Sequence, residues 1–284
     1  MKYDNTAHWK NLHLKYGDSL KTVGISGLSE AYNQLKYSSE SESLVKILDE
    51  LKSDLLSKEK LSVLDIGAGI GFWSALIHSY FQQHNKNSEI NSLDISESAL
   101  EIIKSKNPGF KTIAADLKTI DVNSRAECFD FVVACYCFHH LTGLLDYLNA
   151  VKFAARSVKP GGYLAIMDPI LSKPFSKFYS VDYPTYSGHS LPRPLYLIDG
   201  LLLESGFRRI KLSNALSYLL AANVESNSRW GYFVQNKIWK FFYYLIYKND
   251  GLTKALSGLV KSFDSSLKTS KYSNGTVTAV YQKL

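Results

Sequence analysis

The sequence predicts an α/β fold built on a doubly wound, mostly parallel β-sheet. Short apolar runs that fit buried strands alternate with amphipathic helical patterns, at the interval expected of βαβ units. The first of these strands leads into a glycine-rich turn at residues 67–71, and a helical pattern begins directly behind it. A length of 284 residues fits one large domain, or one domain that carries a sizeable insertion. We therefore expect a parallel sheet with helices on both faces.

The elements of the first part of the chain follow from its periodicity. Leu44, Leu48 and Leu51 recur at helical spacing and predict a helix over 41–56, and a separate helical stretch is expected at 28–37. Buried strands are expected at 61–66, 89–94, 110–114, 129–137 and 162–167. Further helices are expected at about 72–83, 97–105 and 144–158, the last of them stopped by residues 159–162, Lys-Pro-Gly-Gly.

The pattern loosens after residue 168. Residues 169–194 are rich in proline, aromatic and hydroxyl side chains and predict a long loop, which in a compact domain is usually functional. A helix over 195–205 ends at Gly206, and strands are expected at 208–212 and 276–281. Three parts are therefore expected: an N-terminal lid segment at 1–40, a main domain formed by 41–215 and 272–284, and a mostly helical cap insertion at 216–271.

Composition excludes several classes of protein. With 45% hydrophobic residues, 21% charged residues and three cysteines, the chain is neither disordered nor a disulfide scaffold. Its first ten residues lack the apolar stretch of a signal peptide, and no apolar run reaches the roughly 18 residues of a membrane span. We expect a soluble, cytoplasmic protein.

The net charge of +7 is unevenly placed along the chain. Residues 201–284 carry 12 Lys and Arg against 4 Asp and Glu, so the basic excess belongs to the last third. A basic surface favours nucleic acid, anionic lipid or a phosphorylated substrate, and it is equally compatible with a solvated face that binds nothing. The charge distribution alone therefore does not identify a binding partner.

The glycine turn at 67–71 suits a cationic ligand. Glycines permit positive φ and a close approach of the ligand, and the open N–H groups of the helix start offer a polar cradle. Position 72 is Phe, where a dinucleotide-binding fingerprint has Gly. Asp65 directly precedes the turn and would repel a pyrophosphate, whereas it suits an ammonium group.

Two further acids follow the next two strands. Asp94 closes the strand at 89–94, where a carboxylate can accept from both hydroxyls of a ribose, and Asp116 follows the strand at 110–114. The same edge of the sheet would then hold three acids and three glycines, which describes a pocket for a positively charged nucleoside. For a single acid, helix capping is the alternative, since Asp94 precedes the helix start at 96–98.

In motif order, the chain resembles the class I S-adenosylmethionine-dependent methyltransferases. VLDIGAGIGFWS (63–74) is similar to their first motif, LDIS (93–96) to the ribose-binding acid and AADL (114–117) to the adenine-side acid. FDFVVACYCFHHL (129–141) resembles their fourth strand, and VKPGGYLAIMDP (158–169) their fifth. The resemblance implies a Rossmann-like, seven-stranded sheet of order 3-2-1-4-5-7-6 whose seventh strand is antiparallel, with the helical insertion between strands six and seven.

The same resemblance implies S-adenosylmethionine as cofactor, S-adenosylhomocysteine as product and no metal. Asp65 would bind the methionine ammonium, Asp94 the ribose and Asp116 the adenine amine. The remaining implied cofactor contacts are Gly67, Ala68, Gly69, Gly71, Ile95, Leu117 and Cys135. Tyr37 is expected to reach the methionine carboxylate, or else to hold its helix against the sheet.

Candidates for acceptor chemistry lie at the ends of the fourth and fifth strands. His139 and His140 suit a general base, or else they only shape the turn by bonding to backbone. Asp168 would orient the acceptor, or else anchor the turn at Pro169. From the long loop and the insertion, the expected substrate-binding residues are Tyr183, Tyr186, His189 and Trp239.

The expected function is methyl transfer to an O or N atom of a small molecule, such as a metabolite, a natural product or a sugar- or lipid-linked intermediate. Two alternatives stay open: an RNA methyltransferase that uses the basic last third, and a non-catalytic cofactor-binding partner subunit. Nucleic acid is not the expected partner. The aromatic and basic run at 237–248 is compatible with an acceptor-pocket roof, a homodimer contact or a contact with a lipid surface.

Overall fold

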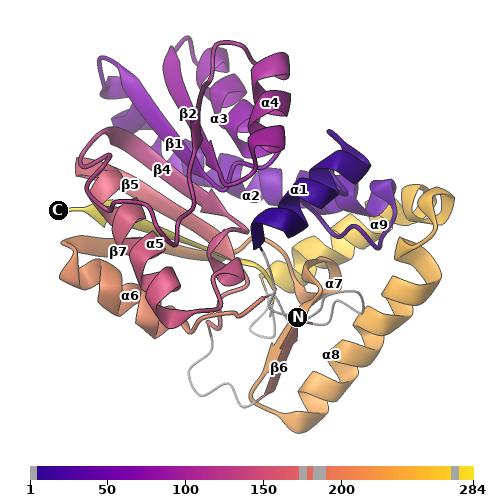
Figure 1. Cartoon of the computed structure of the whole chain (residues 1–284). Helices are drawn as coiled ribbons and strands as arrows, with labels where there is room; N and C mark the ends of the chain where they lie inside the picture. Colours follow the sequence, from indigo (N-terminus) through magenta and orange to yellow (C-terminus); the bar gives the residue numbers. More distant parts are fainter. Residues whose placement is uncertain (1–4, 173–177, 182–189, 270–274) are drawn as a thin grey trace.

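A seven-stranded sheet forms the centre of the computed structural model, which describes residues 5–172, 178–181, 190–269 and 275–284. The strand order is β3-β2-β1-β4-β5-β9-β7, as Figure 1 shows. Its strands are β1 (Leu61–Ile66), β2 (Ser88–Asp94), β3 (Lys111–Ala114), β4 (Phe129–Cys135), β5 (Val158–Asp168), β7 (Phe207–Asn214) and β9 (Val277–Lys283). β9 runs antiparallel to its neighbours, β5 and β7, whereas the pairs among β1 to β5 are parallel. The predicted fold class and strand order are confirmed, because β7 and β9 are the sixth and seventh strands of this sheet.

Helices cover both faces of the sheet, and alternating side chains of one strand serve the two layers. Val132 of β4 packs with α5 (Leu144–Ser157) and α6 (Leu195–Glu204). Its neighbours Phe131 and Val133 pack on the other face. That face is covered by α2 (Glu30–Ser57), α3 (Phe72–Gln83) and α4 (Glu97–Lys106). β4 is buried at every position, as expected of a central parallel strand.

The N-terminal region differs from the sequence-based expectation. The helices expected at 28–37 and 41–56 form one helix, α2. The helix continues through the gap that was left between them, and Ser39 and Glu40 are buried there. An additional helix, α1 (Asn5–Tyr16), packs near α4, and its sequence shows almost no apolar periodicity. β5 also begins earlier than expected, at Val158.

The insertion between β7 and β9 is mostly helical, as predicted. It contains α7 (Tyr218–Ala221), β8 (Asn223–Ser226), α8 (Arg229–Phe242), the π-helical turn η2 (Tyr243–Tyr247) and α9 (Asp250–Lys268). β8 was not predicted, and it pairs antiparallel with β6 (Phe178–Val181), a short strand within the expected loop. Trp239, Tyr243 and Tyr247 pack against Tyr32 and Leu28, so the insertion is seated on the start of α2. None of the described helices is both long and apolar enough to span a bilayer.

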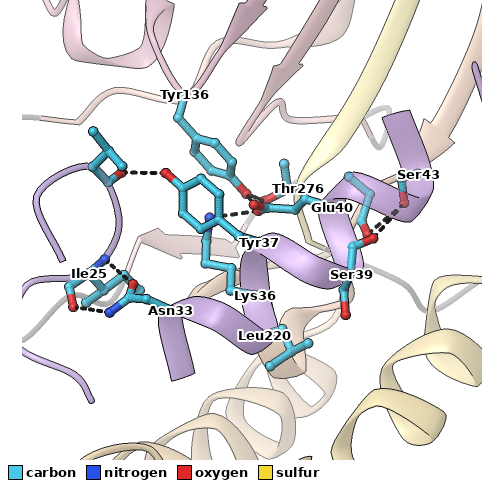
Figure 2. A network of polar contacts seen from close by, with 12 residues as sticks. Ile25, Asn33, Lys36, Tyr37, Ser39, Glu40, Ser43, Tyr136, Leu220 and Thr276 are labelled. Carbon is cyan, nitrogen blue, oxygen red and sulfur yellow. Dashed lines mark hydrogen bonds and ion pairs between the residues drawn. The ribbon is translucent and has the colours of Figure 1, made fainter. Parts of the chain in front are cut away.

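A buried ion pair joins α2 to two distant parts of the sheet, as Figure 2 shows. Lys36 Nζ lies 2.7 Å from Glu40 Oε1, and both side chains are buried. The Tyr136 hydroxyl, from the turn after β4, donates to Glu40 Oε1 and lies 2.6 Å from Thr276 Oγ1, next to β9. Because the phenol has one proton and gives it to the carboxylate, the Thr276 hydroxyl donates to the phenol oxygen.

Burial opposes the charge of both partners in this pair. It lowers the pKa of Lys36 and raises the pKa of Glu40, and in each case the charge of the other residue counteracts the shift. The ring of Tyr136 lies 3.7 Å from Lys36 Nζ, measured to the ring centroid, which adds a cation–π contact. Each charge therefore depends on the other to remain inside the protein.

We predict that Lys36→Met lowers the free energy of unfolding by about 3–5 kcal/mol, because Glu40 then stays buried without its cation. Lys36→Met/Glu40→Gln is expected to recover most of that loss. Urea denaturation measures both. Lys104→Met is the matched control, since it breaks an exposed pair with Glu101 and is expected to cost less than about 1 kcal/mol. Equal losses in Lys36→Met and Lys104→Met would contradict the prediction.

Candidate functional site

The glycine turn after β1 has a backbone that requires glycine. Gly67, Gly69 and Gly71 have φ of 72°, 53° and 81°. A Cβ on Gly67 would lie 2.6 Å from Cys137 Sγ, and one on Gly69 would lie 2.5 Å from Val23 Cγ1. No side chain caps the start of α3, which follows the turn. The turn therefore brings bare backbone to the edge of the sheet where β1 ends.

Asp65 is fully buried at the end of β1, and only one of its two oxygens has a partner. The Ser74 hydroxyl donates to Oδ2 at 2.7 Å, whereas Oδ1 accepts no hydrogen bond from any residue that the structure describes. Burial raises the pKa of Asp65 to about 7, with Ser74 opposing the shift and Asp94 adding to it. An unpartnered, buried carboxylate oxygen is stabilised by a proton or by a cationic ligand.

Asp94 links the glycine turn to the start of α4. Its Oδ2 accepts from the backbone N–H of Gly69 at 2.8 Å, and its Oδ1 accepts from that of Ser96, also at 2.8 Å. Ser96, not Asp94, is the N-cap of α4. Each carboxylate oxygen keeps a further lone pair, so Asp94 can accept from a ligand while it holds the turn. Helix capping alone therefore does not account for Asp94.

A cavity of about 810 Å³, open solvent at its mouth included, lies along these residues. Nine of the predicted cofactor residues line it: Tyr37, Gly67, Ala68, Gly69, Asp94, Ile95, Asp116, Leu117 and Cys135. Asp65 and Gly71 are not among the lining residues. Asp65 has no exposed surface, and Gly71 is the N-cap of α3, where a Cβ would lie 2.8 Å from Ile103 Cγ1.

Several residues that line this cavity were not predicted from the sequence. Trp9 and His13 come from α1, Val23 follows α1, and Trp73 belongs to α3. His13 Nδ1 lies 2.7 Å from the carbonyl oxygen of Trp9, and 3.3 Å from Ser96 Oγ. Only the aromatic composition of the first 40 residues pointed to this region, because α1 lacks an amphipathic pattern.

The tyrosines of α2 occupy different places. Tyr37 lines the cavity, donates its hydroxyl hydrogen to the carbonyl of Val23 at 3.0 Å and stacks on Trp73 at 5.4 Å between ring centroids. Tyr32 is fully buried and donates to the carbonyl of Leu220 at 2.6 Å. Tyr32 therefore holds α2 to the insertion, whereas Tyr37 both fixes the segment at Val23 and faces the cavity.

A second cavity of about 650 Å³ adjoins the first. Four residues line both cavities: Trp9, Val23, Tyr136 and His140. The second cavity is otherwise lined by His8, Leu12, Gly24, Ile25, Ser26, Lys36 and His139. Its wall thus combines aromatic rings, three imidazoles and the buried ammonium of Lys36.

His139 and Asp168 form a buried pair at this second cavity. His139 Nδ1 lies 2.6 Å from Asp168 Oδ1, and the backbone N–H of His139 donates to Oδ2 at 3.0 Å. The carboxylate assigns the ring proton to Nδ1, which leaves Nε2 as a proton acceptor. The His140 ring lies 3.9 Å from that of His139 and 5.0 Å from that of Trp9, between centroids. The candidates at the ends of the fourth and fifth strands are therefore brought together.

The other predicted site residues lie elsewhere. Trp239 is buried among the rings of Tyr32, Tyr243 and Tyr247 and lines neither of these cavities. Tyr183, Tyr186 and His189 fall outside the described residues. Within the described ranges, no group of three or more His, Cys, Asp and Glu side chains is placed to hold a metal ion.

Comparison with known proteins agrees with this geometry. The family model described as "Methyltransferase domain" matches residues 64–166. A demethylmenaquinone methyltransferase of Tropheryma whipplei (strain Twist) is 28% identical over 136 residues, which are 48% of this chain and 52% of that protein. The chain thus aligns with about half the length of this curated relative.

Solved structures share the fold. A SAM-dependent methyltransferase from Archaeoglobus fulgidus is 14% identical, with a TM-score of 0.50, covering 86% of this chain and 94% of its own. The [4+2]-cyclase SpnF is 13% identical, also with a TM-score of 0.50, covering 84% and 80%. Such a likeness concerns the fold alone. Residues 64–166 thus match a methyltransferase domain, and the chain has a fold that S-adenosylmethionine-dependent methyltransferases share.

Proposed function

We propose that the chain transfers a methyl group from S-adenosylmethionine to an O or N atom of a small-molecule acceptor. The observation that carries this proposal is the shared wall of the two cavities. Trp9, Tyr136 and His140 line both of them, so the two cavities adjoin and a ligand in the second would lie close to a ligand in the first. Methyl transfer needs such proximity, because it is an in-line displacement that depends on orientation and on exclusion of water.

The residues present fit S-adenosylmethionine. The unpartnered Oδ1 of Asp65 provides negative charge behind the glycine turn, and the bare turn accommodates a ligand at close range. Asp94 would hold the ribose with its remaining lone pairs, and Asp116 and Leu117 would flank the adenine. When bound, the cofactor supplies an activated methyl group on a positively charged sulfur.

The second cavity would hold the acceptor. Trp9 and Tyr136 offer ring faces or edges to a flat molecule, and the buried Lys36 offers a cation to an acceptor oxygen. α1 contributes to both cavities, which supports a lid function for residues 1–40. Among the described residues of the insertion at 216–271, none lines either cavity. The insertion packs against Ile25, which does line the second one, so the cap would act by supporting that wall.

His139 would take the proton of a hydroxyl acceptor. Its Nε2 is the basic nitrogen, and Asp168 would orient the ring and stabilise the imidazolium that forms. An amine acceptor needs only its neutral form, and for it the same pair would serve to position the nitrogen. His140, which lies between the two cavities, would help to exclude water.

The basic last third does not favour RNA as the acceptor. Six of its 12 basic residues are in ion pairs with acids of this chain: Arg209, Lys211, Lys254, Lys261, Lys268 and Lys283. Such cations are already neutralised and contribute less to phosphate binding. The other alternative is a non-catalytic partner subunit. A measurement of turnover distinguishes it from the proposed enzyme, because such a subunit would bind the cofactor without transferring a methyl group.

The decisive experiment combines binding with turnover. Calorimetry with S-adenosylmethionine and S-adenosylhomocysteine tests the first cavity. Formation of S-adenosylhomocysteine with a panel of small hydroxyl and amine compounds tests the second, beginning with demethylmenaquinone, the acceptor named for the curated relative. Absence of cofactor binding would refute the proposal, and binding without turnover on any acceptor would favour the partner-subunit reading.

We predict that cofactor affinity depends on pH through Asp65. Because the pKa of Asp65 is about 7, its carboxyl is largely protonated at about pH 6 and ionised at about pH 8. A cationic ligand favours the ionised form, so binding releases a proton below about pH 7, and affinity rises with pH. Asp65→Asn is expected to weaken binding about tenfold or more at about pH 8, and to remove this proton release.

Calorimetry in two buffers of different ionisation enthalpy measures the released proton. Asp130→Asn is the matched control, because Asp130 is also a buried carboxylate but lies at the opposite end of β4, paired with Lys159. It is expected to leave both the affinity and its pH dependence unchanged. Retention of the pH dependence in Asp65→Asn would remove Asp65 from the cofactor site.

For a hydroxyl acceptor, we predict that His139→Gln lowers kcat about 100-fold or more and leaves the affinity for S-adenosylhomocysteine unchanged. Asp168→Asn should lower kcat less. Steady-state kinetics over pH measure both. His140→Gln is the matched variant, and equal losses in the two histidine variants would contradict the assignment of proton transfer to His139.

A further inference from the structure

α8 and the turn that follows it expose an unusual row of aromatic side chains. Trp230 is 73% exposed, Phe233 49%, and Phe241 and Tyr244 56% each. Spacings of three and four residues place positions 230, 233, 237 and 241 on one side of the helix. We call Trp230, Phe233, Lys237, Phe241, Tyr244 and Lys248 the α8 stripe. In Figure 1, α8 runs along the outer edge of the molecule, away from the central sheet.

The α8 stripe is also cationic. Lys237 Nζ lies 5.4 Å from the ring centroid of Phe233, and Lys248 Nζ lies 5.1 Å from that of Tyr244. Neither lysine forms an ion pair with an acid among the described residues. Residues 229–248 contain four basic residues and no acid. The stripe thus combines large apolar rings with uncompensated positive charge.

The opposite side of the same helix is firmly packed. Trp239 and Tyr247 are fully buried, and the rings of Tyr32 and Tyr247 lie 4.6 Å apart between centroids. The Tyr247 hydroxyl donates to the carbonyl of Leu219 at 2.9 Å. Because this inner side is already occupied, a rotation that buried the α8 stripe would expose Trp239 and Tyr247 instead.

We propose that the α8 stripe docks on the surface of a membrane that contains anionic lipid. Aromatic rings interleaved with lysines are the chemistry of helices that lie in the bilayer interface, where the rings enter the headgroup boundary and the lysines meet lipid phosphates. A second copy of the chain fits less well. A two-fold contact through this stripe would oppose lysines to lysines with no acid between them.

Docking through this surface would bring the acceptor cavity near the membrane. The inner side of α8 belongs to the same apolar cluster as Ile25, and Ile25 lines the second cavity. A molecule that partitions into the bilayer would therefore be within reach of that cavity. The docking itself does not depend on the proposed methyl transfer and can be tested without cofactor or acceptor.

Cosedimentation of the full chain with lipid vesicles tests the proposal. We expect binding to vesicles of phosphatidylglycerol and phosphatidylcholine, weaker binding to phosphatidylcholine alone, and a loss of affinity as salt increases. Trp230→Ser/Phe233→Ser is expected to weaken binding at least tenfold. Lys237→Glu/Lys248→Glu should do the same, since each lysine near an anionic surface is worth about a factor of five.

Matched controls distinguish binding through the α8 stripe from nonspecific apolar adsorption and from an effect of net charge. Tyr196→Ser/Leu203→Ser removes two exposed apolar residues of α6, which are 77% and 70% exposed. Arg125→Glu/Lys152→Glu makes the same change in net charge at exposed positions remote in sequence from the stripe. Both controls should bind vesicles within about twofold of the wild type. All four variants change exposed residues and should keep the wild-type melting temperature.

Quenching of tryptophan fluorescence by brominated lipid gives a second measurement that needs no destabilising change. Quenching is expected in the wild type and should be much reduced in Trp230→Phe. The proposal is overturned if the wild type binds no anionic vesicles, or if the controls lose binding as much as the stripe variants do. It is also overturned if light scattering shows a dimer that the stripe variants dissociate, or if a short RNA binds as tightly as the vesicles and through the same residues.

Discussion

The buried ion pair between Lys36 and Glu40 is the constraint on which both cavities depend. It holds the middle of α2 against Tyr136, which sits in the turn after β4 with a φ of 54°. Tyr136 lines both cavities, and Lys36 lines the second one. A residue with a large side chain rarely adopts positive φ, so this turn has to be held in place by its partners. The wall between the cavities is therefore positioned by a polar contact in addition to the apolar packing of Tyr136.

That contact gives the site both its shape and its polarity. A well-packed apolar replacement of a buried pair is often no less stable, so stability alone does not require two charges here. What the charges add is a cation at the edge of the second cavity, beside His139 and His140. The Thr276 hydroxyl, next to β9, completes the network at 2.6 Å from Tyr136. The segment that leads into the last strand thus takes part in positioning the same residues of α2.

Local patterns predicted the sheet, the glycine turn and the acids at the strand ends, because each depends on neighbours in the sequence. Contacts between distant segments escaped prediction. Trp9 and His13 reach the first cavity from α1, which has no apolar stripe. The gap between the two expected helices was wrong for a related reason: Glu40 is polar but buried, and its Oε1 is held by Lys36 and by a tyrosine 96 residues away. Trp239, assigned to the acceptor, instead fills the cluster that seats the insertion.

The ion pairs of the chain show which part of its basic excess a binding partner would meet. Half of the cations in the last third are neutralised by acids of α2, α6, α9 and nearby segments, so the formal charge overstates what a partner would meet. Lys237 and Lys248 of the α8 stripe are different, because each stands beside an exposed ring and neither forms an ion pair with an acid among the described residues. The two sides of this segment therefore differ in character. Its buried rings support the wall behind Ile25, and its outer side presents charge and aromatic surface together, which sequence periodicity alone did not separate.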